Sequence, residues 1–192
     1  MLSICFATNN LHKIKEISEV LKGRIHLLSL KDVKCFEELP ETTNTIEGNS
    51  HQKAEYVWKN YHVDCFADDS GLEIEALHGQ PGVHSAYYAG EQRNDDDNIN
   101  LVLKKLENQT NRKARFRTVI TLYWQGKPYQ FEGVVHGNIL LEKRGTNGFG
   151  YDPIFQPVGY DKTYAEMSAE EKNKISHRAI ATQKLVEFLN NI

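Results

Sequence analysis

The fold of this chain is decided by the stretch Cys65-Phe66-Ala67-Asp68-Asp69-Ser70-Gly71-Leu72. Its first half is apolar and typical of a buried strand, whereas its second half carries the residue types that turns prefer. Neighbouring residues of a strand point to opposite faces, so Asp68 and Asp69 cannot both face one core. Aspartate is depleted in strands, and carboxylates at the carboxyl end of a strand lie where open α/β sheets bind ligands. We predict a strand over 63–69 that ends in a polar turn at a ligand site; a turn without function is the alternative.

The N-terminal residues predict the start of an α/β layer. Residues 2–7 form a short apolar run typical of a buried strand, and residues 8–10 interrupt it with polar side chains. Apolar residues then recur on one helical face over 11–21. Free backbone N–H groups at the start of such a helix attract anions. Lys13 lies near this positive end, which is unfavourable unless an anion is close; a solvated lysine is the alternative.

Downstream, strands and helices alternate before a longer β-ribbon. Helices are predicted from Thr45 to Asn60 and after Asp95-Asp96-Asp97. We interpret these three acids as favourable charges at a helix N-terminus, with a metal site as the alternative. Further strands are predicted at 25–30, 72–76, 116–124 and 129–135, the last extending towards 141. The fold class is therefore α/β. The ribbon indicates a second lobe, and clefts between lobes are preferred ligand sites.

The segment 145–155 combines glycines with aromatic and acidic side chains. Glycine permits positive φ angles and close approach of the backbone, and a flexible loop rarely carries so many large rings. We interpret the segment as a stacking surface for a planar ring, with a flexible loop as the alternative. Beyond a capping box at Ser168–Glu171, hydrogen-bond donors that suit phosphates or carbonyl groups follow at Lys172, His177 and Arg178.

Bulk properties favour one ordinary globular domain over residues 1–192. The chain has 192 residues and a formal net charge of −3, which gives no reason to expect nucleic-acid or membrane binding. The cysteines, Cys5, Cys35 and Cys65, form no CxxC pair and lie in apolar surroundings, so we expect small core residues in a reducing compartment. No signal peptide or membrane-spanning run is apparent. We predict a cytoplasmic protein.

Taken in order, the motifs are far more specific than any one of them. They are Thr8-x-Asn10-x-x-Lys13, Asp68-Asp69-Ser70-Gly71-Leu72, Gly79-x-Pro81-Gly82, Gly148-Phe149-Gly150-Tyr151-Asp152-Pro153-x-Phe155 and Ser176-His177-Arg178. This series resembles the inosine/xanthosine triphosphate pyrophosphatase family, from residue 3 almost to the end of the chain. The resemblance implies an elongated two-lobed α/β fold with a long central mixed β-sheet flanked by helices, and a homodimer. It also implies magnesium-dependent hydrolysis of ITP, dITP and XTP to the monophosphate and pyrophosphate.

The resemblance also implies roles for individual residues. Asp69 would accept the proton of the attacking water and bind Mg²⁺, with Glu41 and Asp68 completing the metal site. The residues implied to bind substrate are Thr8, Asn9, Asn10, Leu11, His12 and Lys13 with Lys53 around the phosphates, Ser70, then Phe149, Gly150, Tyr151 and Asp152 packing on the purine, and Lys172, His177 and Arg178 reading its edge. Donors suit the 6-carbonyl of hypoxanthine and leave adenine's amino group unmatched.

Two departures from the family pattern lie beside Glu41. Gly48-Asn49-Ser50 stands where Glu-Asn-Ala is usual, and Thr43 stands where glycine is common. Two alternatives to the expected activity follow. One is a related pyrophosphatase acting on pyrimidine or modified nucleotides. The other is a nucleotide-binding regulator without catalysis, against which the two adjacent acids argue, because carboxylates beside a triphosphate weaken its binding unless a metal bridges them.

Overall fold

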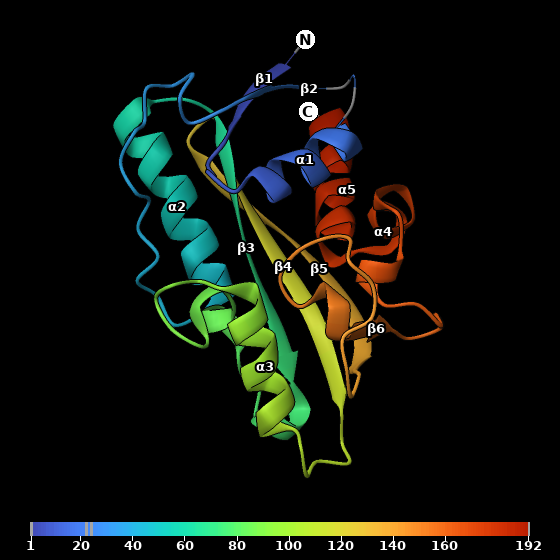
Figure 1. Cartoon of the computed structure of the whole chain (residues 1–192). Coiled ribbons are helices and arrows are strands. Elements are labelled where there is room, and N and C mark those ends of the chain that lie inside the picture. Colours follow the sequence, from blue (N-terminus) through green and yellow to red (C-terminus); the bar gives the residue numbers. More distant parts are fainter. Residues whose placement is uncertain (1, 22, 24, 192) are drawn as a thin grey trace. The chain divides into compact units, whose positions relative to one another are not determined.

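The structure, a computed structural model, describes residues 2–21, 23 and 25–191 (Figure 1). Six strands hydrogen-bond in the order β2-β1-β3-β4-β5-β6. The strands are β1 Leu2–Phe6, β2 Ile25–Leu28, β3 Cys65–Ile74, β4 Lys113–Trp124, β5 Lys127–Ile139 and β6 Phe155–Pro157. The helices are α1 Leu11–Leu21, α2 Ile46–Tyr61, α3 Asp95–Lys105, α4 Ala169–Ile175 and α5 His177–Asn190, with short 3₁₀ turns between them. The sheet is mixed, because β1 pairs parallel with β2 and β3 whereas β5 pairs antiparallel with β6.

The chain divides into two compact units. Unit 1 comprises residues 1–69, 118–133 and 178–192, and unit 2 comprises residues 70–117 and 134–177. The chain passes from one unit to the other within β3, β4 and β5 and again at the start of α5. No helix in the described part of the chain is both long and apolar enough to cross a bilayer.

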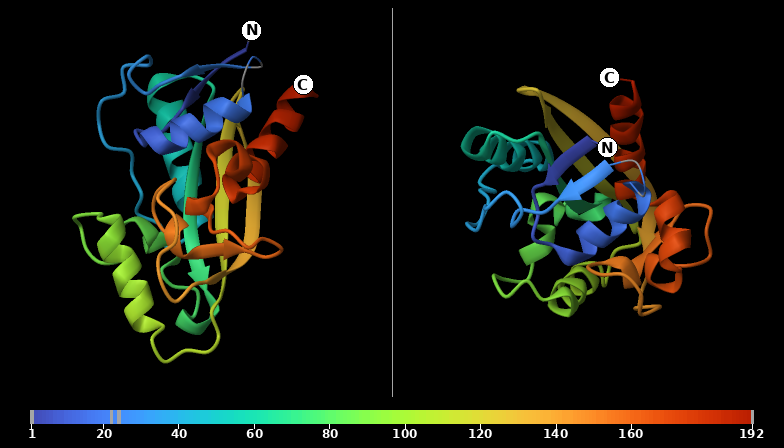
Figure 2. Two further views of the ribbon diagram at one scale, coloured as in Figure 1. Left: turned by 45° about the vertical axis from the view of Figure 1, so that its right-hand side comes forward. Right: turned by 90° about the horizontal axis from the view of Figure 1, so that it is seen from above.

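Unit 1 has an apolar cluster on each face of its strands. Phe66 of β3 joins the first cluster, with Ile17 of α1 and Leu185 of α5, and Figure 2 shows these two helices near each other. Cys65 and Ala67 of β3 join the second cluster, whose helical part is α2. Side chains of β3 therefore alternate between the α1/α5 face and the α2 face, as the period of two requires. All three cysteines are buried without disulfides, which confirms the prediction of core thiols.

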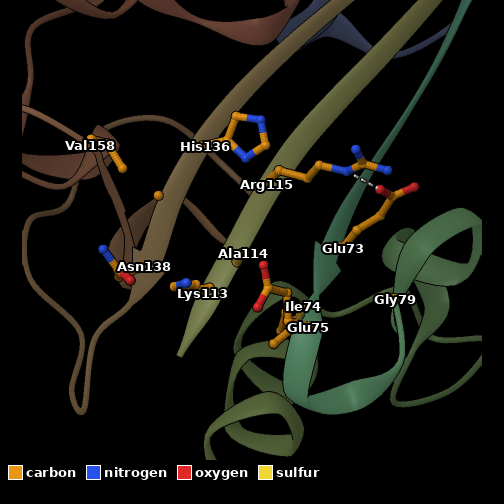
Figure 3. Close-up of a pocket in the computed structure, with 11 residues that line it drawn as sticks. Glu73, Ile74, Glu75, Gly79, Lys113, Ala114, Arg115, His136, Asn138 and Val158 are labelled. Carbon is orange, nitrogen blue, oxygen red and sulfur yellow. Dashed lines mark hydrogen bonds and ion pairs between the residues drawn. The ribbon is translucent and has the colours of Figure 1, made fainter. Parts of the chain in front are cut away.

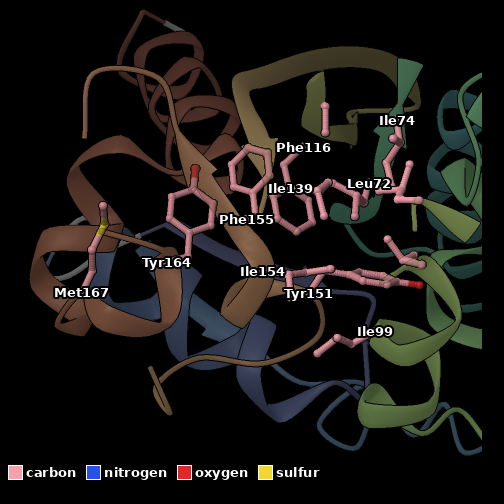
Figure 4. Close-up of a cluster of buried hydrophobic side chains, with 13 residues drawn as sticks. Leu72, Ile74, Ile99, Phe116, Ile139, Tyr151, Ile154, Phe155, Tyr164 and Met167 are labelled. Atoms are coloured by element: carbon pink, nitrogen blue, oxygen red, sulfur yellow. The ribbon is translucent and has the colours of Figure 1, made fainter. Parts of the chain in front are cut away.

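Unit 2 has one large aromatic core (Figure 4). Phe116 of β4 packs edge-on against Phe155, and the rings of Phe155 and Tyr164 also lie in contact, with centroids 5.2 Å apart. Tyr151 lies in the same cluster and donates a hydrogen bond from its hydroxyl to the backbone oxygen of Ser85 at 2.7 Å. The core therefore fixes the segment around Tyr151, which the sequence left open as a flexible loop.

The predicted turn after Asp69 was wrong. Strand β3 continues without interruption from Cys65 to Ile74, so both aspartates lie in the middle of the strand and not at its end. Aspartate has a low strand propensity, but here each carboxylate meets buried cations, which offset the cost of burial. Of the separate strand predicted over 72–76, residues 72–74 are the end of the same element, whereas residues 75 and 76 lie in a 3₁₀ turn.

Other details of the secondary structure also differ from the prediction. Strand β5 ends at Ile139, and the hairpin turn uses only Gln125 and Gly126, both with positive φ. Strand β6 was missed, because its three residues are too few for a period to be visible in the sequence. Residues 169–190 form two helices that meet at Ser176, the extended C-cap of α4.

The start of α2 depends on a close fit between two residues that depart from the family pattern. Thr45 caps the helix by accepting a hydrogen bond from Gly48 N, without the reciprocal half of a capping box. A side chain at position 48 would overlap the Thr43 hydroxyl and lie only 2.8 Å from Thr43 Cβ. That hydroxyl donates to Asn49 Oδ1 at 2.9 Å and is close to Thr45 O, so it cannot rotate away freely. Gly48 and Thr43 are therefore sterically complementary.

We predict that Gly48→Ala destabilises the protein, although alanine is normally better than glycine in a helix by about 1 kcal/mol. Overpacking of this kind costs roughly 1–3 kcal/mol. Thermal unfolding of Gly48→Ala, Thr43→Gly and the double variant measures the coupling. We expect the double variant to be more stable than the sum of the single changes predicts; additive effects would contradict the steric account.

Candidate functional site

Asp68 is the buried centre of an ion-pair cluster on the α1/α5 face of unit 1. Lys13 Nζ lies 3.0 Å from Asp68 Oδ2 and donates a hydrogen bond to Oδ1 at 3.1 Å. Arg178, the second residue of α5, donates from Nε to Asp68 Oδ2 at 3.3 Å and from Nη1 to Glu16 Oε2 at 2.5 Å. The cluster thus ties α1 and α5 to the middle of β3.

The charges of this cluster hold one another ionised. Burial alone would raise the pKa of Asp68, but Lys13, Arg178 and Lys53 hold it well below its usual range. Burial likewise disfavours the charged guanidinium, yet Glu16 and Asp68 hold the pKa of Arg178 above its usual value. Burial lowers the pKa of Lys13, an effect that Asp68 partly offsets. Lys13 is therefore paired with a carboxylate of β3 near the start of α1 and is not a solvated surface lysine.

Asp69 faces α2 and has a different environment. Lys53 of α2 makes an ion pair with Glu41, and its Nζ lies 3.9 Å from Asp69 Oδ1. Asp69 is 9% exposed, and its Oδ2 has no hydrogen-bond partner among residues 2–21, 23 and 25–191. Burial raises the pKa of Asp69, with Lys53 and Lys13 opposing that shift. A buried carboxylate with an unpartnered oxygen and a raised pKa is a candidate for a proton-accepting or metal-binding role.

The segment that carries Glu41 is held against α2 by two amide side chains. Gln52 accepts a hydrogen bond from Thr42 N at 2.9 Å and donates to the Thr42 hydroxyl at 2.8 Å. Asn49 accepts from both the backbone N–H and the hydroxyl of Thr43. Glu41 precedes these residues directly, so α2 supplies both Lys53 and the groups that place Glu41 beside it.

The loop between β1 and α1 is a capped helix start. Asn10 Oδ1 accepts hydrogen bonds from His12 N at 3.0 Å and Lys13 N at 3.2 Å, and the Thr8 hydroxyl oxygen accepts from Asn10 N. Asn9, Asn10 and Leu11 are exposed. The predicted phosphate-binding residues Thr8 to Lys13 therefore surround a helix N-terminus, with Lys13 turned towards Asp68.

In unit 2, three of the residues predicted to bind a base lie together, namely Lys172, Asp152 and Phe149. Lys172 Nζ donates to Asp152 Oδ2 at 2.7 Å, and both side chains are buried. The same ammonium lies 4.9 Å from the centre of the Phe149 ring, within cation–π range. His177 is buried and stacks on Phe116, with ring centroids 4.6 Å apart and planes inclined by 7°.

Arg178 departs from this set. The sequence placed it with Lys172 and His177 as a reader of the base, but its guanidinium pairs with Asp68 and Glu16 in unit 1. The chain crosses from unit 2 to unit 1 between His177 and Arg178, so adjacent residues serve different units. Ser70 lies in β3, half-buried, as the first residue of the unit 2 part of that strand.

A bound magnesium ion would fit two of the three carboxylates predicted to hold it. In the described part of the chain, no group of three or more His, Cys, Asp and Glu side chains is arranged to hold a metal. Asp68 is engaged by Lys13 and Arg178, so it does not fit a metal ligand. Asp69, with its unpartnered buried oxygen, and the partly exposed Glu41 do fit. Magnesium commonly uses one or two carboxylates together with water and substrate phosphates.

A hollow in unit 2 is separate from all these residues (Figure 3). Its volume is about 390 Å³, and charged and polar side chains such as Glu73, Lys113, Arg115 and His136 line it. Arg115 donates to Glu73 across it at 2.5 Å. None of the residues predicted to act on a nucleotide lines this hollow, so concavity alone does not locate the chemistry.

Sequence reasoning missed several residues that hold the site together. Glu16 lies one helical turn after Lys13, and that spacing was the available signal for its pairing with Arg178. Asn49 is a polar residue on the buried side of α2, which indicated a hydrogen-bonding role. No signal in the sequence indicated the contact of Gln52 with Thr42, because it depends on how an irregular segment folds back.

Similarity to known proteins shows the family of this chain. The sequence profile of the Ham1 family matches residues 4–188. The chain belongs to the Ham1 family. A protein of Flavobacterium johnsoniae called dITP/XTP pyrophosphatase is 56% identical over 188 residues, which cover 98% of each chain. Two solved structures are also similar: the Ham1 protein of Staphylococcus aureus, with a TM-score of 0.91, 40% identity and 98% of each chain covered, and a HAM1 protein of Coxiella burnetii, with a TM-score of 0.93, 38% identity and complete coverage of both chains.

These relatives confirm the resemblance inferred from the motifs and the predicted α/β fold with a mixed sheet and flanking helices. These matches cover nearly all of this chain and nearly all of each relative. The Ham1-family assignment therefore concerns the whole described chain and not one of its units.

The contrast between the two aspartates predicts opposite effects of neutralising them. The pKa of Asp68 is lowered on folding, so its charge stabilises the fold above its unfolded pKa of about 4, and this contribution is lost as the pH falls below it. The pKa of Asp69 is raised, so its ionisation opposes folding at neutral pH. We expect Asp68→Asn to cost roughly 3 kcal/mol at pH 7 and Asp69→Asn to raise the melting temperature.

Thermal unfolding of both variants between pH 3 and pH 8 measures this contrast. The destabilisation caused by Asp68→Asn should decrease below about pH 4, because Asp68 in the unfolded wild type is then protonated. The gain in Asp69→Asn should shrink as the pH falls through the folded pKa of Asp69. Equal destabilisation by both substitutions at pH 7 would contradict the assignment of the two environments.

Proposed function

We propose that this protein hydrolyses non-standard purine nucleoside triphosphates, namely ITP, dITP and XTP, to the monophosphate and pyrophosphate. The observation that carries the proposal is the buried carboxylate of Asp69, with one unpartnered oxygen, next to Lys53 and Glu41. The name dITP/XTP pyrophosphatase, carried by a relative that is 56% identical, supports the substrate class.

Asp69 is the proposed proton acceptor for the attacking water. A base is most effective when its pKa lies near the working pH, and burial moves the pKa of Asp69 in that direction. Lys53 lies close enough to orient the Asp69 carboxylate and to interact with a phosphate. Lys13 and the capped start of α1 supply positive charge for the remaining phosphates.

We propose Mg²⁺ as the cofactor, held by Asp69 and Glu41 together with phosphate oxygens of the substrate. When bound there, the ion supplies charge neutralisation and lowers the pKa of a coordinated water. Lys53 keeps the two carboxylates close to each other before a cation binds, because it pairs with Glu41 and lies near Asp69. Asp68 is not proposed as a ligand, since its role is to neutralise Lys13 and Arg178.

The base is proposed to bind in unit 2 against Phe149. Lys172 carries three donors; one contacts Asp152, and we propose that the same ammonium group also donates to the 6-carbonyl of hypoxanthine or xanthine. An adenine would present a donor to a donor, and sites built on hydrogen bonds reject such analogues strongly. His177 is proposed to support this edge from its stacked position on Phe116. Tyr151 and Gly150 shape the loop that carries the ring.

We further propose that the protein acts as a cytoplasmic homodimer that binds neither nucleic acid nor membranes. The buried thiols without disulfides are those of a protein kept in a reducing compartment. The net charge of −3 offers no general attraction for a polyanion. The homodimer rests on the family resemblance alone.

The proposal is tested by measuring pyrophosphate release from ITP, dITP, XTP, GTP, ATP and a pyrimidine triphosphate, each with and without Mg²⁺. We expect fast magnesium-dependent release from the first three only. Asp69→Asn is the matched control, because it keeps the shape of the side chain; it should bind ITP and lose turnover. Near-normal kcat in Asp69→Asn would remove Asp69 from the role of base.

Other outcomes of the same panel favour the alternatives. Preferred release from the pyrimidine nucleotide would indicate a related pyrophosphatase of different specificity. Tight binding of ITP without release at saturating Mg²⁺ would indicate a regulator. The glycine at position 48, where the family usually has glutamate, is the feature that favours this alternative.

We predict that Lys172→Ala lowers the ratio of kcat/KM for ITP over ATP by about 10-fold or more, because a hydrogen bond from a charged group is lost. Lys174→Ala is the control: Lys174 lies on the same helix, is exposed and pairs only with Glu170 among the interactions described. Lys172→Arg keeps the charge beside Asp152 and separates folding from selectivity. An unchanged ratio in Lys172→Ala would contradict the role of Lys172 in reading the base.

A further inference from the structure

The three acids at the start of α3 have different partners. Asp96 pairs with Lys143 at 2.6 Å, and Asp97 accepts from Gln92 at 3.2 Å, so both contact side chains at the surface. Asp95 instead accepts a hydrogen bond from the backbone N–H of Gly150 at 2.8 Å. The sequence predicted only that these acids complement the helix dipole. Asp95 has an additional role, because it binds the glycine-rich segment.

That segment is irregular, with local internal hydrogen bonds such as that from Asp152 N to Phe149 O at 3.3 Å. Gly148 and Gly150 have φ angles of +76° and +60°, so neither continues a regular element. Phe149 N donates to Asp152 Oδ2 at 3.0 Å, and Tyr151 is fixed through its hydroxyl. Between these two points, the hydrogen bond from Gly150 N to Asp95 joins the residue after Phe149 to helix α3. This bond therefore contributes to the direction of the Phe149 ring, together with Asp152 and Lys172, which also contact Phe149.

The N-terminal end of α3 is well suited to hold a loop. Asn94 caps the helix by accepting from Asp97 N at 3.0 Å. Asn98, one turn on, accepts from Ala89 N at 2.7 Å and is buried, so it fixes residues 86–89 on the same helix. A carboxylate in the first turn is favoured by the helix dipole, and its hydrogen bond to an N–H is charge-assisted and therefore strong. Asp95 thus anchors the loop to a fixed support.

We propose that Asp95 is a positioning residue for the purine site: its carboxylate holds Gly150 and thereby fixes the Phe149 ring against which the base binds. The consequence for substrate rests on the proposed function, whereas the anchoring of the loop does not. Asp95 touches no reacting group, so its loss affects binding and selectivity for the base and leaves the chemistry at Asp69 intact.

The anchoring is tested first in the protein without nucleotide. Hydrogen–deuterium exchange of the segment 145–151 is compared in the wild type, Asp95→Ala and Asp96→Ala. The last variant is the matched control, because it removes a carboxylate from the same helical turn. We expect exchange of the Gly150 amide to accelerate about 10-fold or more in Asp95→Ala alone, as expected for loss of a hydrogen bond to a charged acceptor. Equal exchange in all three proteins would overturn the proposal.

The role in substrate binding is tested with the same variants and ITP. We expect Asp95→Ala to raise KM about 10-fold, to leave kcat within a factor of about 3 and to lower the preference for ITP over ATP. Asp95→Asn, which keeps an acceptor oxygen, should recover most of the affinity. Faster exchange with unchanged KM would overturn the link between Asp95 and the base. If the wild type releases no pyrophosphate, the proposed function fails and this link fails with it, while the exchange experiment still decides the anchoring.

Discussion

The site depends on one constraint: two neighbouring carboxylates in the middle of a buried strand must face opposite sides of the sheet. Strand geometry directs Asp68 towards α1 and α5 and Asp69 towards α2. A buried ionised carboxylate is costly unless it is paired. The helices on each face of β3 therefore have to supply cationic side chains to the carboxylate on that face. Lys13 and Arg178 do so for Asp68, and Lys53 does so for Asp69.

The two carboxylates meet this requirement to different extents, and the difference separates structure from chemistry. Asp68 has two cations in contact, its pKa is strongly lowered, and its oxygens are engaged. Asp69 has one cation at 3.9 Å, which it shares with Glu41, and burial prevails in raising its pKa. Neighbouring groups with pKa values moved in opposite directions often divide the roles of stabilising and reacting. Here Asp68 stabilises the fold, and Asp69 keeps an oxygen available.

Much of this arrangement was accessible from the sequence, and the reasons for the failures are physical. Period-two alternation correctly separated Asp68 from Asp69, whereas the position of Lys13 near the helix start did not indicate that its partner is Asp68. Turn propensity misjudged Ser70 and Gly71, because tertiary ion pairs override local preference in a buried strand. The partner of Arg178 could not be read from its neighbours, since adjacent residues of one helix start belong to different compact units.

The number of engaged carboxylates also constrains how a cation can bind. In the proposed function, Asp68 is reserved for Lys13 and Arg178, the carboxylates proposed to bind Mg²⁺ are Asp69 and Glu41, and Lys53 lies close to both. A hard cation with six oxygen ligands is then mostly coordinated by water or by the substrate. Binding of metal and triphosphate must therefore be mutually favourable, because each supplies charge that the other needs, and Lys53 can transfer its interaction from a carboxylate to a phosphate. On this account, binding of the cation is coupled to binding of a phosphorylated substrate because the protein alone supplies few carboxylate ligands.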